Sequence, residues 1–250
     1  VDFFELLGFL FKPGVKRMAA KFVSDISEAD GCYKVSFVPI EQTLYWPREC
    51  SIEGISQVAC ETFDRKDWHY YQKDHTPVSP DDILVDVGAA EGLFALSVIN
   101  RCKQIILIEP NDYFVRALGM TFQAYMDKVT IHHIAVGNKE GEITFDQDSL
   151  SGKVDGSAAS GPLKRITTID KLLGDARITY LKADLEGYEM EMLKGAKTTI
   201  QRNRPKIAIT SYHTENVATE IIREVKSYVP EYQCYVKGIF QEMGKPVMIH

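Results

Sequence analysis

The chain has 250 residues, of which 45% are hydrophobic and 26% charged, as in an ordinary globular protein with one large domain or one domain and an appendage. Its formal net charge of -6 argues against a nucleic-acid partner, because phosphate backbones select basic surfaces and the sequence has no basic stripe. The apolar opening, residues 1–11, is interrupted by acids and is shorter than the ~20 residues of a membrane span, so we expect no span.

The five cysteines lie at positions 32, 50, 60, 102 and 234, without CxxC or another metal-ligand spacing. An odd and scattered set is typical of reduced thiols. This pattern predicts a cytoplasmic protein.

Residues 1–80 differ in character from the rest of the chain. The spacing of apolar residues predicts an amphipathic helix over residues 3–22, and CYKVSFVPI and TLYWP are typical of strands. The aromatic segment DWHYYQKDHTPVSP follows, and its prolines mark a boundary. We therefore predict an N-terminal extension, 1–80, that packs on or caps a core domain, 81–250.

From residue 81 onward, strand-like and helix-like patterns alternate. Five apolar runs predict buried strands: ILVDVGA, QIILIEP, VTIHHIAV, ITYLKAD and KIAITSYH. Helical spacing appears in the segments between and after them: GLFALSVINR, YFVRALGMTFQAYM, YEMEMLKGAKTTIQR and NVATEIIREVKSYV. The tail, YQCYVKGIF and KPVMIH, predicts an antiparallel hairpin at one edge. Right-handed crossovers then give an α/β fold with a doubly wound, mostly parallel, Rossmann-like sheet of seven strands.

Ligands of such a sheet bind outside the carboxyl ends of its strands. The first core strand ends in DVGAAEGLF, where Gly88 permits a tight turn, and the next strand ends at Glu109, which can accept the hydroxyls of a ribose. A dinucleotide requires glycine where Ala90 stands and no acid where Glu91 stands, because its pyrophosphate is negative. S-adenosylmethionine carries a sulfonium and an ammonium instead, so Asp86 and Glu91 favour it over a dinucleotide.

The motifs together resemble a known family. VDVGAAEGLF, IEP, IAVGN with GEITF, TTIDKLL, LKADLEGYEMEMLKGA and RPKIAITSYH are similar, in this order, to FkbM-type S-adenosylmethionine-dependent methyltransferases. The distinctive part is K-x-D-x-E-G-x-E followed by L-K-G-A. The resemblance implies a class I methyltransferase fold and methylation of a hydroxyl, on a sugar, a glycan precursor or a secondary metabolite.

Carried over by position, the loop from Asp86 to Gly92 would hold the methionine part, Glu109 the ribose, and Ala135 would lie near the adenine. The family more often has Asn or a similar polar residue where Ala90 and Glu91 stand, so the chain departs from the pattern there. The expected cofactor-binding residues are Asp86, Gly88, Ala89, Ala90, Glu91, Gly92, Glu109, Pro110, Asn111, Ala135 and Asp184.

The acceptor hydroxyl must lose its proton, and its pKa is about that of water, on the order of 15.7. Asp184 and His213 end two strands that we expect to be neighbours, so both should lie above the reacting methyl group. His213 has an ordinary pKa near 6.5, and we predict that it acts as a neutral general base with Asp184 as its orienting partner. Lys182 lies on the same strand face as Asp184, and forms a structural ion pair or holds the acceptor.

Some alternatives stay open at this point. Asp184 also suits a helix N-cap, and Asp184, Glu186 and a neighbour could bind Mg²⁺, although we expect no metal. Tyr70, Tyr71 and Tyr212 are candidates for the acceptor pocket, together with His69 and His75. The acceptor would also contact the insertion at 146–163. The competing functions are an NAD(P)-dependent oxidoreductase and a binding domain without turnover.

Overall fold

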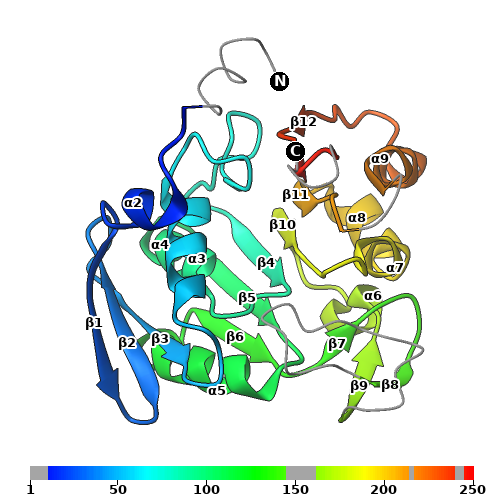
Figure 1. The fold of residues 1–250 in the computed structure, drawn as a ribbon. Helices are drawn as coiled ribbons and strands as arrows, with labels where there is room; N and C mark the ends of the chain where they lie inside the picture. The colour runs from blue at the N-terminus through cyan, green and yellow to red at the C-terminus, as the bar shows by residue number, and fades with distance from the viewer. Residues whose placement is uncertain (1–10, 145–161, 214–216, 240–244) are drawn as a thin grey trace.

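The computed structural model describes residues 11–144, 162–213, 217–239 and 245–250. Its centre is a seven-stranded sheet with the strand order β12-β13-β11-β10-β4-β5-β6 (Figure 1). The strands are β4 (Ile83–Val87), β5 (Gln104–Ile108), β6 (Val129–His132), β10 (Tyr180–Ala183), β11 (Lys206–Thr210), β12 (Val236–Lys237) and β13 (Met248–Ile249). The strands from β11 to β6 are parallel, whereas β13 is antiparallel to both β11 and β12. The doubly wound sheet and its edge hairpin are therefore confirmed.

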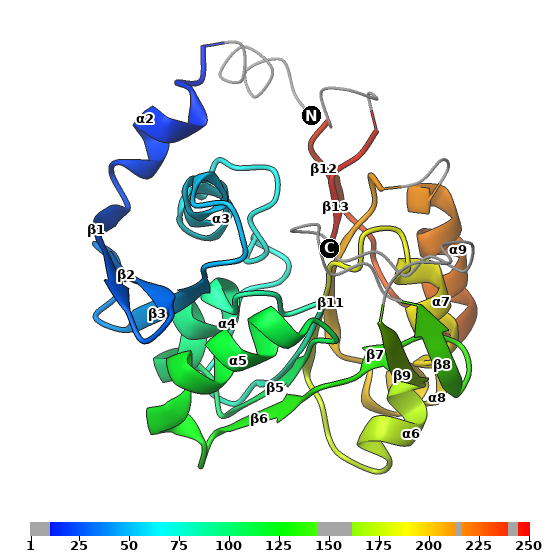
Figure 2. The same cartoon turned by 60° about the horizontal axis from the view of Figure 1, so that its bottom comes forward.

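Helices cover both faces of this sheet, as Figure 2 shows. On one side lie α3 (Glu53–Phe63), α4 (Leu93–Val98) and α5 (Asp112–Thr121), with the 3-10 turns η1 (Ile99–Arg101) and η2 (Gln123–Tyr125). On the other side lie α6 (Ile169–Leu173), α7 (Glu189–Lys194), α8 (Lys197–Asn203) and α9 (Val217–Tyr228). Side chains alternate between the two faces along each strand, and each face packs into its own buried hydrophobic cluster. Leu84 and Tyr180 belong to the cluster that includes residues of α4, and Val85 and Leu181 belong to the cluster that includes residues of α7.

Two segments that the sequence predicts as single elements are each divided. The predicted strand VTIHHIAV splits at a turn, in which the Ile134 amide donates to the His132 carbonyl at 3.1 Å. Its second half becomes β7 (Ala135–Val136), which pairs with β9 (Leu163–Thr167) in a separate sheet of order β7-β9-β8, with β8 at Gly141–Thr144. Ala135 therefore does not end the third core strand as expected.

The predicted helix over YEMEMLKGAKTTIQR is likewise two helices, α7 and α8, with Gly195 between them. A Cβ at Gly195 would overlap the carbonyl oxygen of Gly137, which follows β7. The Gly195 carbonyl also accepts the Asp170 amide at 2.9 Å. The L-K-G-A sequence thus provides the close backbone contact between this helix pair and the small sheet.

The N-terminal part contains α2 (Val15–Ala19) and a three-stranded antiparallel sheet of β1 (Val23–Ala29), β2 (Cys32–Phe37) and β3 (Thr43–Pro47). The two strands predicted here are confirmed, whereas β1 and α3 were not predicted. The predicted helix over 3–22 is confirmed only over α2, because residues 12–14 before it and 20–22 after it are not helical. Residues 3–10 lie outside the described part.

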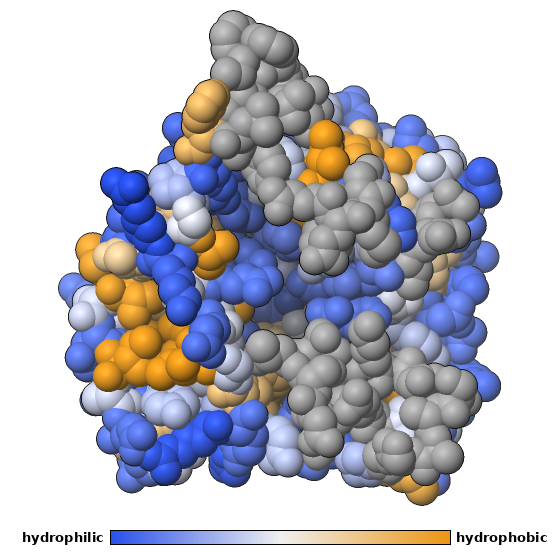
Figure 3. All heavy atoms as spheres, viewed as in Figure 1, coloured by the Kyte–Doolittle hydropathy of each residue, from blue (hydrophilic) through white to orange (hydrophobic). Residues whose placement is uncertain are grey.

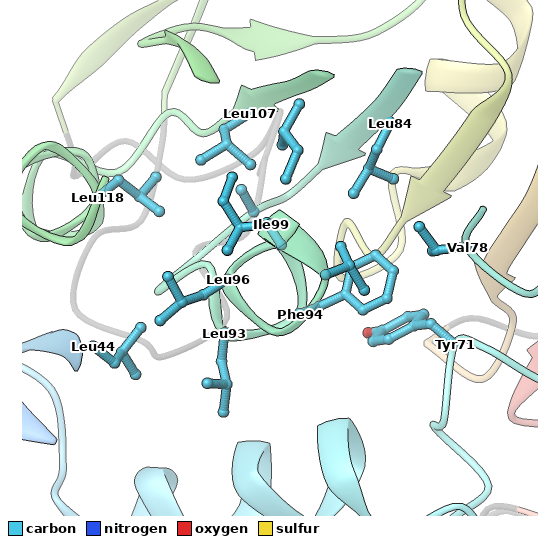
Figure 4. Close-up of a cluster of buried hydrophobic side chains, with 14 of the residues drawn as sticks. Leu44, Tyr71, Val78, Leu84, Leu93, Phe94, Leu96, Ile99, Leu107 and Leu118 are labelled. Atoms are coloured by element: carbon cyan, nitrogen blue, oxygen red, sulfur yellow. The ribbon is translucent and has the colours of Figure 1, made fainter. Parts of the chain in front are cut away.

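This N-terminal sheet packs directly on the helices of the main sheet. Leu44 of β3 lies beside Leu93 and Leu96 of α4, and Tyr71 lies beside Phe94 (Figure 4). The Tyr45 amide donates to the Thr121 hydroxyl at 2.9 Å. The division into an extension and a core at residue 80 remains a proposal.

The longest helix with described ends, α9, has 12 residues. None of the helices in the described ranges is long and apolar enough to cross a lipid bilayer. Most of the insertion expected to contact the acceptor, its residues 146–161, lies outside the described residues.

Candidate functional site

A cavity of about 350 Å³ opens outside the carboxyl ends of β4, β5 and β10. From β4 the chain builds β5 and β6 on one side and returns to place β10 and β11 on the other. The cavity therefore lies at the point where the strand order reverses, as expected for a doubly wound sheet. Figure 3 shows a hollow bordered by hydrophilic residues on the face seen in Figure 1.

Most of the predicted site residues line this cavity. They are Tyr71, Asp86, Gly88, Ala89, Ala90, Glu91, Glu109, Pro110, Ala135, Lys182, Asp184 and Tyr212. Among the described residues, the predicted Tyr70, Gly92, Asn111 and His213 do not contribute to its lining.

The loop after β4 has the backbone geometry that its glycines predict. Gly88 has φ +69, and a Cβ there would overlap the carbonyl oxygen of Asp184. Glycine is therefore required for the close approach of the loops after β4 and β10. Ala90 has φ 46, a left-handed conformation that is uncommon for alanine. Gly92 packs against Leu118 and Phe122, where a Cβ would lie 2.5 and 2.9 Å from their side chains, so its position serves helix packing.

Glu109 ties this loop to the next strand. One carboxylate oxygen accepts the Ala90 amide at 2.8 Å, and the other accepts the Asn111 amide at 2.8 Å. Burial raises the pKa of Glu109 to about 7, against the opposing effect of these two hydrogen bonds. Each oxygen keeps a second lone pair, so the carboxylate can still accept hydrogen bonds from a ligand in the cavity. Asn111 caps α5, because its side chain accepts the Tyr113 amide at 2.9 Å.

Lys182 and Asp86 form a buried ion pair across the two central strands. They are register partners of β10 and β4, and the Lys182 Nζ lies 2.9 Å from Asp86 Oδ1. The ammonium also donates to the Gly88 carbonyl at 2.7 Å. Burial alone would lower the pKa of Lys182, but the charges of Asp86 and Asp184 outweigh it and raise the pKa. Of the two readings for Lys182, the contacts match the structural ion pair.

The cavity is strongly acidic. Its described lining contains six acidic side chains and one lysine. That lysine is already paired with Asp86. Burial raises the pKa of Glu91 to about 7. Such a lining favours a cationic ligand over a phosphate.

Three polar side chains meet at the rim of the cavity, where β10 and β11 end. We call Asp184, Glu186 and His213 the rim cluster. His213 Nε2 lies 3.7 Å from Asp184 Oδ1 and 3.3 Å from Glu186 Oε2. One ligand atom from each of the three residues lies within 4.8 Å of the others. The structure thus brings Asp184 and His213 together at the rim, as the strand order predicted.

The nearest partner of His213 is Glu189, the first residue of α7, and not the expected Asp184. Glu189 Oε1 lies 2.8 Å from His213 Nδ1 and also accepts the Leu185 amide at 3.0 Å. Burial alone would lower the pKa of His213, but the bond to Glu189 and the charges of Asp184, Glu189 and Glu186 raise it to about 9. These surroundings therefore favour a protonated imidazole at pH 7, whereas we expected a neutral one.

Aromatic side chains lie next to the rim cluster. The Tyr71 hydroxyl donates to Asp184 Oδ2 at 2.7 Å, and the His69 and Tyr212 rings meet edge to face at 5.2 Å. Gln57 and Glu61 of α3 also line the cavity.

These contacts include residues that sequence reasoning missed. Nothing in the sequence pointed to Gln57 and Glu61, because α3 itself was not predicted. Glu189 could have been found, since it is the last acid of the K-x-D-x-E-G-x-E motif.

Comparisons with known proteins agree with this geometry. The methyltransferase FkbM domain family matches residues 86–233. The crystal structure of methyltransferase FkbM from Methylobacillus flagellatus KT superposes with a TM-score of 0.56 at 20% identity, covering 80% of this chain and 55% of that chain. This chain thus spans little more than half the length of that protein.

Other solved structures are more distant. Trm5b from Pyrococcus abyssi has 8% identity and a TM-score of 0.45, covering 90% of this chain and 61% of that chain. A precorrin-6y C5,15-methyltransferase from Geobacter metallireducens GS-15 has 15% identity and a TM-score of 0.37, covering 68% and 79%. No curated protein matches the sequence. The predicted class I methyltransferase fold is confirmed.

Proposed function

The chain belongs to the FkbM methyltransferase domain family, and on this premise we propose that it transfers a methyl group from S-adenosylmethionine to a hydroxyl of a sugar, a glycan precursor or a secondary metabolite. The observation that carries the proposal is the acidic cavity at the strand-order reversal. The acceptor class rests on the family resemblance alone.

The cavity residues fit S-adenosylmethionine better than a dinucleotide. Lys182 is the one cation in the described lining and is paired with Asp86, so Glu91 and the other acids there have no second basic side chain beside them. The excess of acidic side chains would favour a positive ligand group and repel a pyrophosphate. Glu109 would hold the ribose hydroxyls, and Ala135 and Pro110 supply less polar walls for the adenine. When bound, the cofactor supplies an electrophilic methyl group on a sulfonium.

The chain's own residues then have to align the acceptor and remove its proton. Asp184 is suited to hold the acceptor hydroxyl, because the charges of Lys182 and His213 and the Tyr71 hydrogen bond lower its pKa against the effect of burial. An ionised carboxylate accepts a hydrogen bond from a hydroxyl and fixes its direction. His213 was our candidate base, but its imidazole keeps a proton among three carboxylates. We therefore assign proton removal to the rim cluster as a unit.

Calorimetric titration with S-adenosylmethionine and with S-adenosylhomocysteine tests the cofactor. We expect both to bind, and absence of binding at about 1 mM ligand, an affinity of roughly -4 kcal/mol, would remove the proposal. A fluorescence titration with NADH is the matched comparison. Saturable NADH binding without S-adenosylhomocysteine binding would instead support the oxidoreductase reading.

A second experiment tests whether the methyl group is transferred to an oxygen atom. Acceptor candidates bearing hydroxyl groups would be incubated with cofactor carrying a ¹³C-labelled methyl group. The ¹³C chemical shift of the product distinguishes an O-methyl from an N-methyl or a C-methyl group. Products methylated only on nitrogen or carbon would contradict the hydroxyl acceptor. An intact cofactor site with no acceptor among the compounds screened would favour a binding domain.

A further inference from the structure

We propose that the rim cluster is a divalent metal site, with Asp184, Glu186 and His213 as its protein ligands and Mn²⁺ as the best-matched ion. The binding itself is independent of the proposed function, and only its catalytic consequence rests on that function. Sequence spacing alone led us to expect no metal, and the arrangement in space leads to the opposite inference.

The first argument is the convergence of three ligand atoms. A carboxylate oxygen of Asp184, one of Glu186 and a ring nitrogen of His213 lie within 4.8 Å of one another. Ligand atoms about 2.0–2.2 Å from a common ion are expected to lie roughly 3–4 Å apart. The distances from His213 Nε2, 3.3 Å to Glu186 and 3.7 Å to Asp184, are in that range. A small adjustment of side chains would place all three around one ion.

The second argument is the orientation of the imidazole ring. Glu189 Oε1 lies 2.8 Å from His213 Nδ1 and also accepts the Leu185 amide. A carboxylate oxygen used in this way is an acceptor, so the proton of that contact belongs to Nδ1. Nε2, on the other side of the ring, then faces the carboxylates of Asp184 and Glu186 at 3.7 and 3.3 Å. Either a proton on Nε2 or a metal ion bound by it has to lie between these groups.

The burial of the imidazole is the third argument. The His213 side chain is 7% exposed, and its Nε2 is buried without a hydrogen bond from the described residues. A buried polar atom without a hydrogen bond costs free energy, so native structures rarely keep one without a reason. The atom faces the two carboxylates at the cavity rim. A metal ion would satisfy Nε2 and both carboxylates together.

Hydrogen bonds from neighbouring side chains fix the orientation of His213 and Asp184, as is usual for metal ligands. A histidine ligand typically donates its other ring nitrogen to a carboxylate, which fixes the ring and raises the basicity of the ligating nitrogen. Glu189, 1% exposed, has this role for His213. Asp184 is fixed by the Tyr71 hydroxyl on Oδ2, and the Thr210 hydroxyl lies 3.1 Å from its Oδ1.

Glu186 adds a backbone feature in the same direction. It has φ 53, a left-handed conformation that costs a non-glycine residue energy. Gly187 follows with φ 103. Strained backbone conformations are found most often at functional sites, where the surrounding structure holds them in place. Here the strained conformation accompanies the approach of the Glu186 carboxylate to His213.

The ligand set favours a particular class of ion. Two carboxylates and one imidazole suit Mn²⁺, because it accepts hard oxygen ligands and also tolerates nitrogen. Three protein ligands leave positions open toward the cavity. An acceptor hydroxyl bound there would have a lowered pKa, as bound water does on a metal, so its proton can leave to solvent while the oxygen keeps the electron pair that forms the new bond to the methyl carbon. The bond between that carbon and the sulfonium breaks at the same time, and its electron pair stays on the sulfur of the leaving S-adenosylhomocysteine.

Electron paramagnetic resonance of added MnCl₂ tests the site without any turnover. The metal-stripped chain is titrated with Mn²⁺ in the absence of cofactor, and the signal of free Mn²⁺ gives the bound fraction. We expect one bound ion per chain. Glu186→Gln and His213→Gln should each weaken binding by more than 100-fold, and Glu189→Gln by about 10- to 100-fold through His213.

Glu191→Gln is the matched control, because Glu191 lies on α7, as Glu189 does, and pairs with Lys194 instead of with the rim cluster. It should bind Mn²⁺ as the wild type does. The partly exposed Glu186 is the safer variant, since its replacement leaves the buried contacts of Glu189 and His213 in place. Thermal unfolding of each variant checks that it is folded.

The result that overturns the proposal is an absence of binding at about 1 mM Mn²⁺, or equal binding by wild type and folded Glu186→Gln. A proton then occupies the cluster instead. Titration with S-adenosylhomocysteine in the presence of EDTA separates this failure from that of the proposed function. Binding of S-adenosylhomocysteine without Mn²⁺ binding refutes the metal site alone. Mn²⁺ binding without S-adenosylhomocysteine binding supports the metal site and refutes the cofactor.

Discussion

Replacing Gly88 with alanine gives a sharp test of how the site is assembled. The added Cβ would overlap the carbonyl oxygen of Asp184 and would lie 3.0 Å from its carbonyl carbon. These are backbone atoms, so relief requires the loop after β10 to move away from the loop after β4. The residue would also have to keep φ +69, which glycine adopts freely and alanine adopts only at a cost in free energy.

The expected cost follows from these two effects. Overpacking costs about 1–3 kcal/mol, and a left-handed alanine costs about 1–2 kcal/mol more, so Gly88→Ala should lower the free energy of unfolding by about 2–5 kcal/mol. For a chain of this size that corresponds to a Tm lower by roughly 5–15 °C. Because Asp184 moves with its carbonyl, S-adenosylhomocysteine binding should weaken as well.

Differential scanning calorimetry with Gly119→Ala as the control measures the effect. Gly119 lies in α5 and has nothing within 4 Å of its would-be Cβ. Alanine there should raise stability by up to about 1 kcal/mol, because it is the better helix former. Equal Tm values for wild type and Gly88→Ala would refute the reasoning, since the two loops would then not be in contact.

Three further predictions concern other buried charges. Glu109→Gln should weaken S-adenosylhomocysteine binding by about 10- to 100-fold in calorimetry, because one of the two backbone amides that the carboxylate accepts loses its partner at a cost of about 1–3 kcal/mol; unchanged affinity would remove Glu109 from the cofactor site. Lys182→Met should destabilise the chain by about 3–5 kcal/mol, because it leaves Asp86 buried without its counter-charge, and adding Asp86→Asn should recover most of the loss in denaturant unfolding; an additive double variant would contradict the ion pair. Burial lowers the pKa of His250 to about 4 in the folded chain, whereas the unfolded chain binds this proton near pH 6.5. The free energy of unfolding therefore falls as the pH drops below 6.5. Between pH 7.5 and 5 the wild type should lose about 2 kcal/mol more than His250→Asn, and parallel pH curves would contradict this.

The central sheet could be predicted because its strands are buried on both faces. Runs such as ILVDV and QIILI are apolar throughout, and the structure places them in β4 and β5. Periodicity could not show where a strand or helix is interrupted by a tertiary contact. The turn at His132 and the contact between Gly195 and Gly137 both depend on residues distant in the sequence or on backbone geometry.

The candidate site was predictable where it depends on strand order. Parallel neighbours end at the same edge, which brought Asp184 and His213 together. The partner of His213 was not predictable in this way, because Glu189 reaches it from a helix start after the tight turn at Gly187. The wall formed by Gln57 and Glu61 depends on how α3 packs over the sheet, which local pattern does not determine.

The protonation state of His213 is the clearest case of a property that needs the folded surroundings. An ordinary pKa near 6.5 follows from the residue type, but three carboxylates within reach raise it to about 9. No spacing rule in the sequence gives the number of charges that surround one buried ring.

A crystal structure of the chain with S-adenosylhomocysteine tests the central claim most directly. We predict that the ligand occupies the cavity outside β4, with its ammonium toward Asp86 and its ribose against Glu109. A ligand bound elsewhere, or a cavity that stays empty at saturating concentration, would contradict the account.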